Sequence, residues 1–177
     1  MAITPDTKDW TWVLEQPCPE CGFDAAEVAL DDIPRLIREN AAGWGPVLAR
    51  TDAAVRPNDH TWSPLEYGAH VRDVFRTFSV RLGLMLSEDD PLFANWDQDA
   101  TAVAERYHEQ DPAVVGRELA LAAASLADAF AAVPVTESTR TGRRSDGARF
   151  TVTTLAQYVL HDPVHHLHDV HRPLAEL

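Results

Sequence analysis

The sequence lacks both a targeting signal and a long apolar run. Its first ten residues, MAITPDTKDW, contain neither a basic region nor the apolar stretch that follows it in a secretory signal. The longest apolar stretch, Leu119 to Val135, is interrupted by Ser125 and Asp128, so it does not fit a membrane span. We therefore expect a cytoplasmic protein that has no membrane partner.

Basic residues are scarce as well. Fifteen Lys and Arg stand against 28 Asp and Glu, which gives a formal net charge of −13. A chain with this balance is repelled by phosphate backbones and by anionic lipid surfaces. This argues against nucleic acid as a partner. A small-molecule substrate is expected instead, and a homo-oligomer is compatible with the sequence.

Alternating runs of Val, Ile and Thr are rare, whereas alanine is plentiful, which favours helices over strands. The share of hydrophobic residues, 45%, and of charged residues, 24%, is ordinary for a globular protein. A chain of 177 residues has room for one domain with a sizeable core. We expect a single domain over residues 1–177, in which residues 1–30 form an N-terminal extension that contains CPEC.

Hydrophobic periodicity divides the chain into four long helices. The second is the best marked, because Ser63 to Glu66, SPLE, is a capping box with proline at the first helical position. The fourth is expected to begin near Thr154, with Gln157 as its capping-box partner, and to continue into a histidine cluster. The other predicted helices are two long ones, about Asp31 to Arg50 and about Asp111 to Val133, and a short one, about Asp99 to His108.

The polar segment 136–150, TESTRTGRRSDGARF, is too polar to form a buried helix and predicts an extended excursion before the last helix. Four long helices in one domain suggest a bundle. The predicted fold is therefore all-α: a four-helix bundle with an irregular N-terminal extension and a long polar loop before the last helix.

Five of the eight histidines lie in residues 160–171, LHDPVHHLHDVH. His161 and His165 are four residues apart, so on a helix they share one face and can reach the same divalent ion, while His166 points away from them. His168 is a rival ligand, and Pro163 should kink the helix between the pair. The alternative is a solvated, histidine-rich tail that binds nothing.

The second helix offers a candidate for a third ligand. His70 falls close to the interior stripe of that helix, and ligand sites in bundles are built from side chains on facing helices. The alternative is a hydrogen-bonded core histidine. Three nearby carboxylates, those of Asp73, Asp162 and Asp169, are candidate acceptors for ring N–H groups, although they could equally be solvated surface charges.

The sequence resembles the DinB-like metalloprotein family of four-helix bundles. The resemblance rests on W-S-P-x-E-x-x-x-H, here Trp62 to His70, and on H-x-x-x-H, here His161 to His165. It implies a divalent ion held by His70, His161 and His165, with open positions for water or substrate. Zinc and nickel are the metals expected first, and iron follows.

The family includes mycothiol-dependent maleylpyruvate isomerases and transferases that join a low-molecular-weight thiol to an electrophile. The resemblance therefore implies a metal-dependent thiol S-transferase that uses a mycothiol-like thiol as co-substrate. A metal-dependent hydrolase fits the same residues, with water in place of the thiol. In a third hypothesis the bundle is not an enzyme, and a structural metal staples two helices.

Two further motifs have open roles. Cys18 and Cys21, in PCPECG, could be redox-active, half of a zinc site, or simply reduced; zinc would need more ligands, with His60 and His108 as candidates. We expect this segment to pack on the bundle through Trp10, Trp12 and Phe23. The basic residues Arg143 and Arg144 are predicted to bind the carboxylates of a thiol cofactor or substrate; alternatively they neutralise acidic surface.

Overall fold

The computed structural model describes residues 9–172 of the chain. Within this range it contains the helices α1 (Ile33–Leu48), α2 (Pro64–Ser87), α3 (Gln98–Ala104), α4 (Pro112–Ala131) and α5 (Val152–Asp169), and the strands β1 (Thr141–Arg143) and β2 (Arg149–Thr151). Short 3-10 helices connect them at Trp10–Leu14, Ala25–Glu27, Leu30–Asp32, Tyr107–Glu109 and Val135–Glu137.

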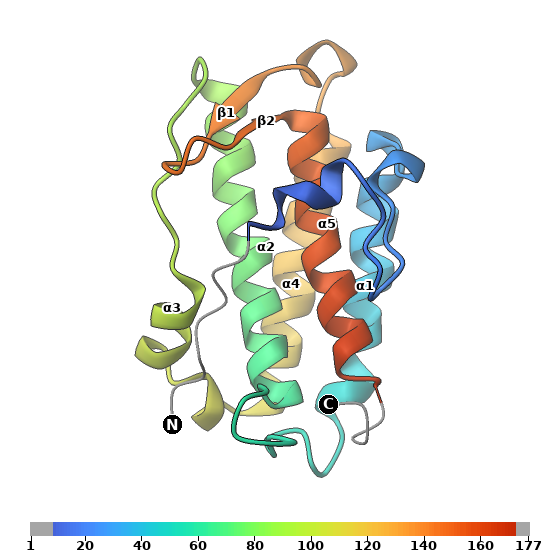
Figure 1. Ribbon diagram of the computed structural model, residues 1–177, viewed down its shortest axis with the longest axis vertical. Coiled ribbons are helices and arrows are strands. Elements are labelled where there is room, and N and C mark those ends of the chain that lie inside the picture. The colour runs from blue at the N-terminus through green and yellow to red at the C-terminus, as the bar shows by residue number, and fades with distance from the viewer. Residues whose placement is uncertain (1–8, 173–177) are drawn as a thin grey trace.

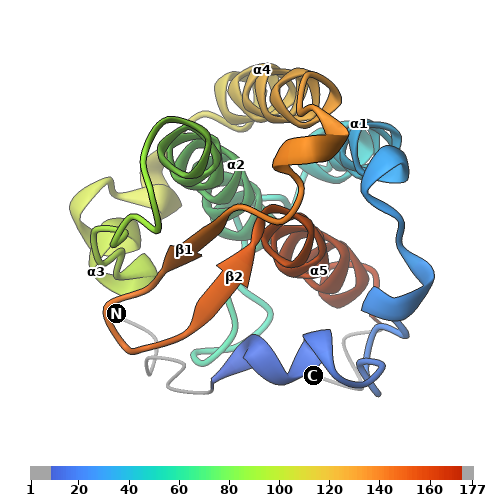
Figure 2. The same cartoon turned by 90° about the horizontal axis from the view of Figure 1, so that it is seen from above.

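Helices α1, α2, α4 and α5 form a four-helix bundle, which confirms the predicted fold class (Figure 1). Seen from above, α4 and α5 lie on opposite sides, and α1 and α2 lie between them (Figure 2). Each of α1 and α2 therefore packs against both α4 and α5. In the part of the chain that is described, no helix has the length and apolar character needed to cross a membrane.

Helix α2 begins as the sequence predicts. The Ser63 hydroxyl accepts a hydrogen bond from the Glu66 backbone N–H, and the Glu66 carboxylate accepts one from the Ser63 backbone N–H at 2.9 Å. Glu66 is buried and also pairs with Arg56. Burial alone would raise the pKa of Glu66, but the hydrogen bonds from Arg56 and Ser63 outweigh it and lower the pKa. The start of α2, one turn before His70, is thus held firmly.

Helix α5 begins two residues earlier than expected. Thr151, rather than Thr154, is the N-cap, and Thr154 is its capping-box partner. Gln157, expected in the capping box, instead donates to the backbone carbonyls of Ala25 and Val28, at 2.9 and 3.0 Å. The sequence prediction failed here because the Gln157 amide satisfies carbonyls of a distant segment, which local spacing does not reveal.

The polar segment before α5 forms a small antiparallel hairpin. Thr141 pairs with Thr151, Gly142 with Phe150, and Arg143 with Arg149, so the extended excursion expected from the sequence is a two-stranded sheet at the end of the bundle where α5 begins (Figure 1). Gly142 is required there, because a Cβ would lie 2.5 Å from the Phe93 ring. The hairpin fixes the position of the first turn of α5.

The described part of the N-terminal extension runs along the outer side of α5 (Figure 2). Phe23 is buried in the bundle core, Trp12 is partly buried against it, and Trp10 contacts the rings of His161 and His165. Cys18, which is 1% exposed, is also part of this core. The extension therefore packs on the bundle through the three aromatic residues that the sequence suggests.

The capping box of α2 provides a direct test of the fold. Replacing Ser63 by Ala should lower the free energy of unfolding by about 1 kcal/mol, because the backbone N–H of Glu66 loses its acceptor. The matched control is Ser87→Ala at the other end of the same helix, where the hydroxyl donates to the backbone carbonyls of Gly83 and Leu84; it should change stability by less than about 0.5 kcal/mol. Equal effects in urea denaturation would contradict the capping argument.

Candidate metal centres

Helix α5 carries two pairs of potential metal ligands that are offset by one residue. His161 and His165 form one pair, and Asp162 and His166 form the other. Each pair has the i, i+4 spacing that places two side chains on one face, but successive residues on a helix are rotated by about 100°. The two pairs therefore face different neighbours, and each joins a separate group of potential ligands.

The first group, called here the His–Asp–His group, consists of His70, Asp162 and His166. Their ligand atoms all lie within 4.8 Å of one another. Nε2 of His70 is 3.2 Å from Oδ1 of Asp162, and the rings of His70 and His166 have their centroids 5.0 Å apart. The group bridges α2 and α5 with two imidazoles and one carboxylate.

The His–Asp–His group is buried on one side and open on the other. His70 is fully buried between Trp62 and Trp96, and it stacks on the Trp96 ring with 9° between the planes. The Asp162 side chain is 32% exposed. Burial would raise the pKa of Asp162, but its interactions with His70 and His166, including the contact with Nε2 of His70, outweigh burial and lower the pKa. Asp162 is therefore an anion that solvent can reach.

The second group, called here the Cys2His2 group, consists of Cys18, Cys21, His161 and His165. Their ligand atoms also lie within 4.8 Å of one another. Both cysteines are free thiols, and Sγ of Cys18 is 3.6 Å from Nδ1 of His165. Three of the four side chains are buried, and Cys21 is partly exposed. The group joins the N-terminal extension to α5.

The Cys2His2 group contains an unsatisfied buried atom. His161 is only 4% exposed, and its Nε2 has no hydrogen-bond partner within residues 9–172. Burial, assisted by neighbouring His165, lowers the pKa of His161 to about 4, so its ring is neutral near pH 7. Burial raises the pKa of the Cys21 thiol to about 11. A neutral imidazole is the form that binds metals.

The three histidines expected from the resemblance are divided between these groups. His161 and His165 lie together as predicted, but they face Cys18 and Cys21, and His70 lies with Asp162 and His166 instead. His70 is buried, as its position on the interior stripe suggested. A single ion bound by His70, His161 and His165 stays a prediction, whereas the exposed His168 belongs to neither group.

Sequence reasoning missed His166 and Asp162 as a pair of ligands. Asp162 and His166 have the same i, i+4 spacing as His161 and His165, so the sequence contained the pattern. A pair of histidines is a more specific sign of metal binding than an aspartate and a histidine, because aspartates are common on helix surfaces. The expectation that His166 points away from the first pair is correct. It points toward His70, and this could not be known before the orientation of α5 was fixed.

The carboxylates considered as acceptors for ring N–H groups have different surroundings. Asp162 contacts His70, and Asp169 lies 3.2 Å from Nδ1 of His166, so both are close to imidazoles. Asp73 contacts no histidine among the described residues; it binds Arg72 and accepts a hydrogen bond from the Tyr107 hydroxyl at 2.7 Å. The prediction for Asp73 fails because its side chain turns toward the segment after α3.

The two arginines expected to bind an anion already have acidic partners. Arg143 pairs with Asp90, with Nε and Oδ2 2.9 Å apart. Arg144 pairs with Asp146 and donates a hydrogen bond to the Tyr158 hydroxyl at 2.9 Å. These contacts agree with the alternative that the arginines neutralise acidic surface. Their binding to a thiol or substrate stays a prediction.

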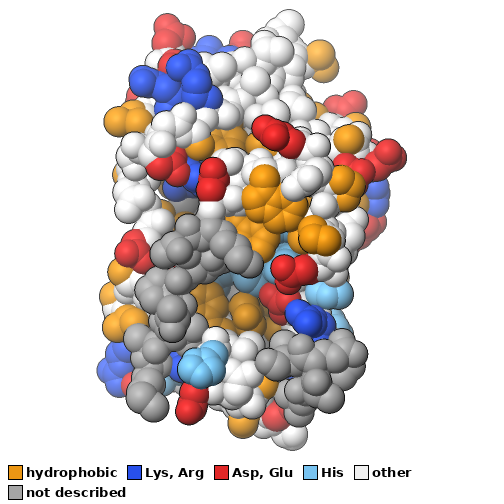
Figure 3. Space-filling model, viewed as in Figure 1, with side chains coloured by type: hydrophobic (Ala, Val, Ile, Leu, Met, Phe, Trp, Pro, Cys, Tyr) orange, Lys and Arg blue, Asp and Glu red, His pale blue; other side chains and the backbone are white. Residues whose placement is uncertain are grey.

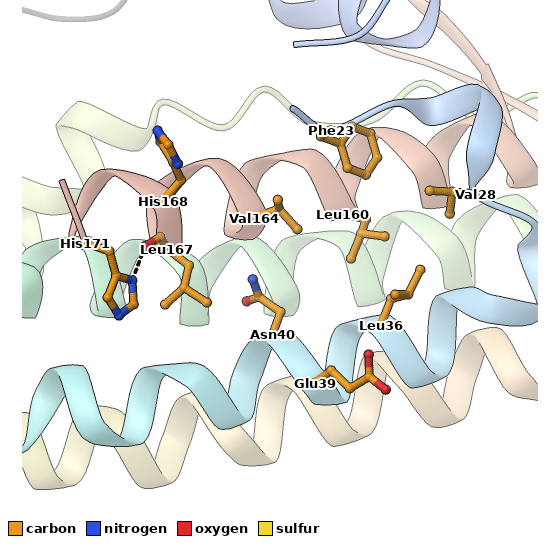
Figure 4. A pocket seen from close by; sticks show the side chains of 10 residues that line it. All are labelled: Phe23, Val28, Leu36, Glu39, Asn40, Leu160, Val164, Leu167, His168 and His171. Carbon is orange, nitrogen blue, oxygen red and sulfur yellow. Dashed lines mark hydrogen bonds between the residues drawn. The ribbon is translucent and has the colours of Figure 1, made fainter. Parts of the chain in front are cut away.

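A pocket of about 450 Å³ lies on a third side of α5. Leu160, Val164 and Leu167 of α5 face Leu36 of α1 across it, while Phe23 covers one end (Figure 4). On the face of the molecule seen in Figure 1, histidine side chains lie near the middle of the surface (Figure 3). The pocket beside α1 is largely apolar, and its polar lining consists of Glu39, Asn40, His168 and His171.

These features define the protein as a four-helix bundle with two candidate metal-binding groups on its last helix. The sequence matches no family model and no curated protein. Among solved structures, the fold is similar to that of YfiT from Bacillus subtilis, described as a probable metal-dependent hydrolase with an unusual four-helix bundle topology. The TM-score is 0.71 at 18% identity, over 80% of this chain and 85% of that one. This likeness supports the bundle fold.

The buried contacts of Asp73, one turn after His70, lead to a pH-dependent prediction. Burial alone would raise the pKa of Asp73, but hydrogen bonds from Arg72 and Tyr107 outweigh it and lower the pKa. A carboxyl whose pKa is lower in the folded state adds stability above its unfolded pKa of about 3.9, and this stability is lost as the pH falls through the folded value. Tyr107→Phe should thus lower the free energy of unfolding by about 1.5 kcal/mol at pH 7.

The same variant should differ less from the wild type as the pH falls through the folded-state pKa of Asp73, because the carboxylate then becomes protonated. Urea denaturation over a series of acidic pH values and at pH 7 measures this difference. A loss of stability that stays the same across the whole series would show that the Tyr107 hydroxyl acts through packing and not through the Asp73 carboxylate.

Proposed function

We propose that the protein is a divalent-metal-dependent enzyme whose reactive ion is bound by the His–Asp–His group. The observation that carries this proposal is the convergence of two imidazoles and a carboxylate from α2 and α5 within 4.8 Å. Two histidines and one carboxylate form a donor set that binds zinc in hydrolases and iron(II) in oxygenases. The set thus suits a divalent cation and leaves coordination positions open.

The exposure of the group matches a reactive site better than a structural one. His70 is inaccessible and fixed between two indole rings, whereas the Asp162 and His166 side chains are 32% and 20% exposed. Structural metal sites are closed by four protein ligands, whereas catalytic sites keep a position for water or substrate. A small molecule could therefore approach from the side of Asp162 and His166.

The residues of the site have separate tasks in this proposal. His70 and His166 would hold the cation through their imidazole rings, and Asp162 would compensate part of its charge. Asp169, 3.2 Å from Nδ1 of His166, orients that ring. When bound, the metal would supply Lewis-acid chemistry that makes water or a thiol nucleophilic near neutral pH. Trp62 and Trp96 shield His70 from solvent.

Hydrolysis is the reaction that the neighbouring structure favours, because YfiT is described as a probable metal-dependent hydrolase. Transfer of a mycothiol-like thiol to an electrophile remains the second candidate, because the sequence resembles a family with that activity. The two reactions differ only in the nucleophile. An assay with an activated ester and an electrophile, each with and without a low-molecular-weight thiol, separates them.

The competing assignment is a single ion held by His70, His161 and His165. The two assignments differ in which α5 residues matter for binding at His70. If the His–Asp–His group binds the reactive metal, His166→Ala should lower the metal affinity by about 100-fold or more. Even the loss of a residue that only hydrogen-bonds to a ligand lowers metal affinity by about 10–100-fold. Zinc or nickel affinity by competition with a chelator, and hydrolytic or transfer activity, should fall together.

His168→Ala provides the matched control, because His168 lies on the same helix, is exposed and is in neither group. It should leave affinity and activity unchanged. If His166→Ala binds metal and reacts like the wild type while His161→Ala abolishes both, the three-histidine assignment replaces ours. If the purified protein binds no divalent metal at micromolar concentration, the metal-dependent function fails altogether.

A further inference from the structure

The Cys2His2 group has no part in the proposed reaction, yet it brings together four side chains from two distant segments. Cys18 and Cys21 come from the N-terminal extension, and His161 and His165 come from α5. Two thiols and two imidazoles form a set of soft and borderline donors that suits zinc. The group contains no carboxylate ligand, which distinguishes it from the His–Asp–His group.

The distance between one thiol and one imidazole of the group is that expected between two ligands of the same zinc ion. Zinc–sulfur and zinc–nitrogen bonds of about 2.3 and 2.1 Å at the tetrahedral angle place the two ligand atoms roughly 3.6 Å apart. Sγ of Cys18 is 3.6 Å from Nδ1 of His165. The buried Nε2 of His161, which has no hydrogen-bond partner within residues 9–172, would find one in such an ion.

The backbone of residues 18–23 is folded so that both sulfur atoms can face α5. The Cys18 N–H donates to the Phe23 carbonyl at 2.8 Å, and the Gly22 N–H donates to the Cys18 carbonyl at 2.9 Å. Gly22 has a φ of +74°, which a residue with a side chain rarely adopts. C-x-x-C is a ligand spacing that recurs in structural zinc sites.

The surroundings of His165 agree with metal binding through Nδ1. Its Nε2 lies 3.7 Å from the Asp169 carboxylate and 3.8 Å from that of Glu20. Histidine ligands commonly direct their second ring nitrogen toward a carboxylate, which fixes the ring orientation. Asp169 therefore lies between the two groups, close to His165 and to His166.

We propose that Cys18, Cys21, His161 and His165 form a second, structural zinc site. Four protein ligands would close the coordination sphere, so the ion would bind no substrate. It would fasten the N-terminal extension to the middle of α5, where Gln157 already binds the carbonyls of Ala25 and Val28. This site is independent of the proposed reaction, since it shares no ligand with the His–Asp–His group.

This proposal corrects the expectation that His60 and His108 would complete a zinc site with the cysteines. His60 and His108 are exposed and absent from the group, and His108 lies 3.3 Å from the carboxylate of Glu109. The sequence placed them as candidates only because His161 and His165 were assigned to another ion. Once α5 is oriented, the two cysteines have nearer partners.

The test uses the full chain after removal of metals by a chelator, then reloaded with cobalt(II) or zinc. Cobalt should produce a thiolate-to-metal charge-transfer absorption, and the wild type should bind one more equivalent of zinc than the Cys18→Ser/Cys21→Ser double variant. The charge-transfer absorption should be absent in that variant and retained in His166→Ala. Removal of zinc should lower the melting temperature of the wild type, because the ion binds only the folded arrangement.

His168→Ala, from the same helix, is the control and should bind as much zinc as the wild type. His161→Ala should weaken zinc binding at the cysteines by about 100-fold or more, because it removes a ligand, and loss of a residue that only orients a ligand already lowers affinity by about 10–100-fold. Wild-type protein without a charge-transfer absorption, or with the same zinc content as the double-cysteine variant, would overturn the proposal. If the double variant does not fold, the cobalt spectrum of the wild type still decides the question.

Discussion

The rotation of about 100° per residue along α5 is the constraint on which both candidate centres depend. Two i, i+4 pairs offset by one residue cannot share one ion, because they form adjacent stripes on the helix. One stripe faces α2 and meets His70, and the next faces the N-terminal extension and meets the two cysteines. A third stripe, with Leu160 and Val164, faces the pocket beside α1. A single helix thereby carries two candidate metal-binding groups and one wall of an apolar pocket.

The position of α5 is fixed from several directions. Thr151 and the hairpin determine where the helix begins. The Asn40 amide donates to the carbonyl of Pro163 at 2.9 Å, and Pro163 lies between the first and the second ligand of each pair. Proline in a helix leaves the carbonyl four residues earlier, here that of Val159, without its usual backbone donor. Asn40 of α1 binds the carbonyl of Pro163 itself and fastens this turn of α5 to α1. The rings on either side of Pro163 thus depend on contacts with three other elements.

The long helices, the capping box of α2 and the burial of His70 were predictable because each depends on local spacing and hydrophobic periodicity. The partner of each histidine was not predictable in the same way. The sequence shows that His161 and His165, four residues apart, share one face of a helix. Whether that face is turned toward His70 or toward Cys18 depends on the rotation of α5 about its axis, which core packing determines. Gln157 shows the same limit, because its acceptors lie about 130 residues away.

The two donor sets differ in metal selectivity and in open coordination positions, so one helix could hold two ions with different roles. Thiolates favour zinc strongly, and a closed tetrahedral set accepts it without an exchangeable position. A set of two imidazoles and a carboxylate is less selective among zinc, nickel and iron, and it leaves room for a substrate. Asp169 approaches both His165 and His166, so a change of charge in one group would act on the other through this carboxylate. The two groups are therefore separate in ligands but adjacent in their electrostatics.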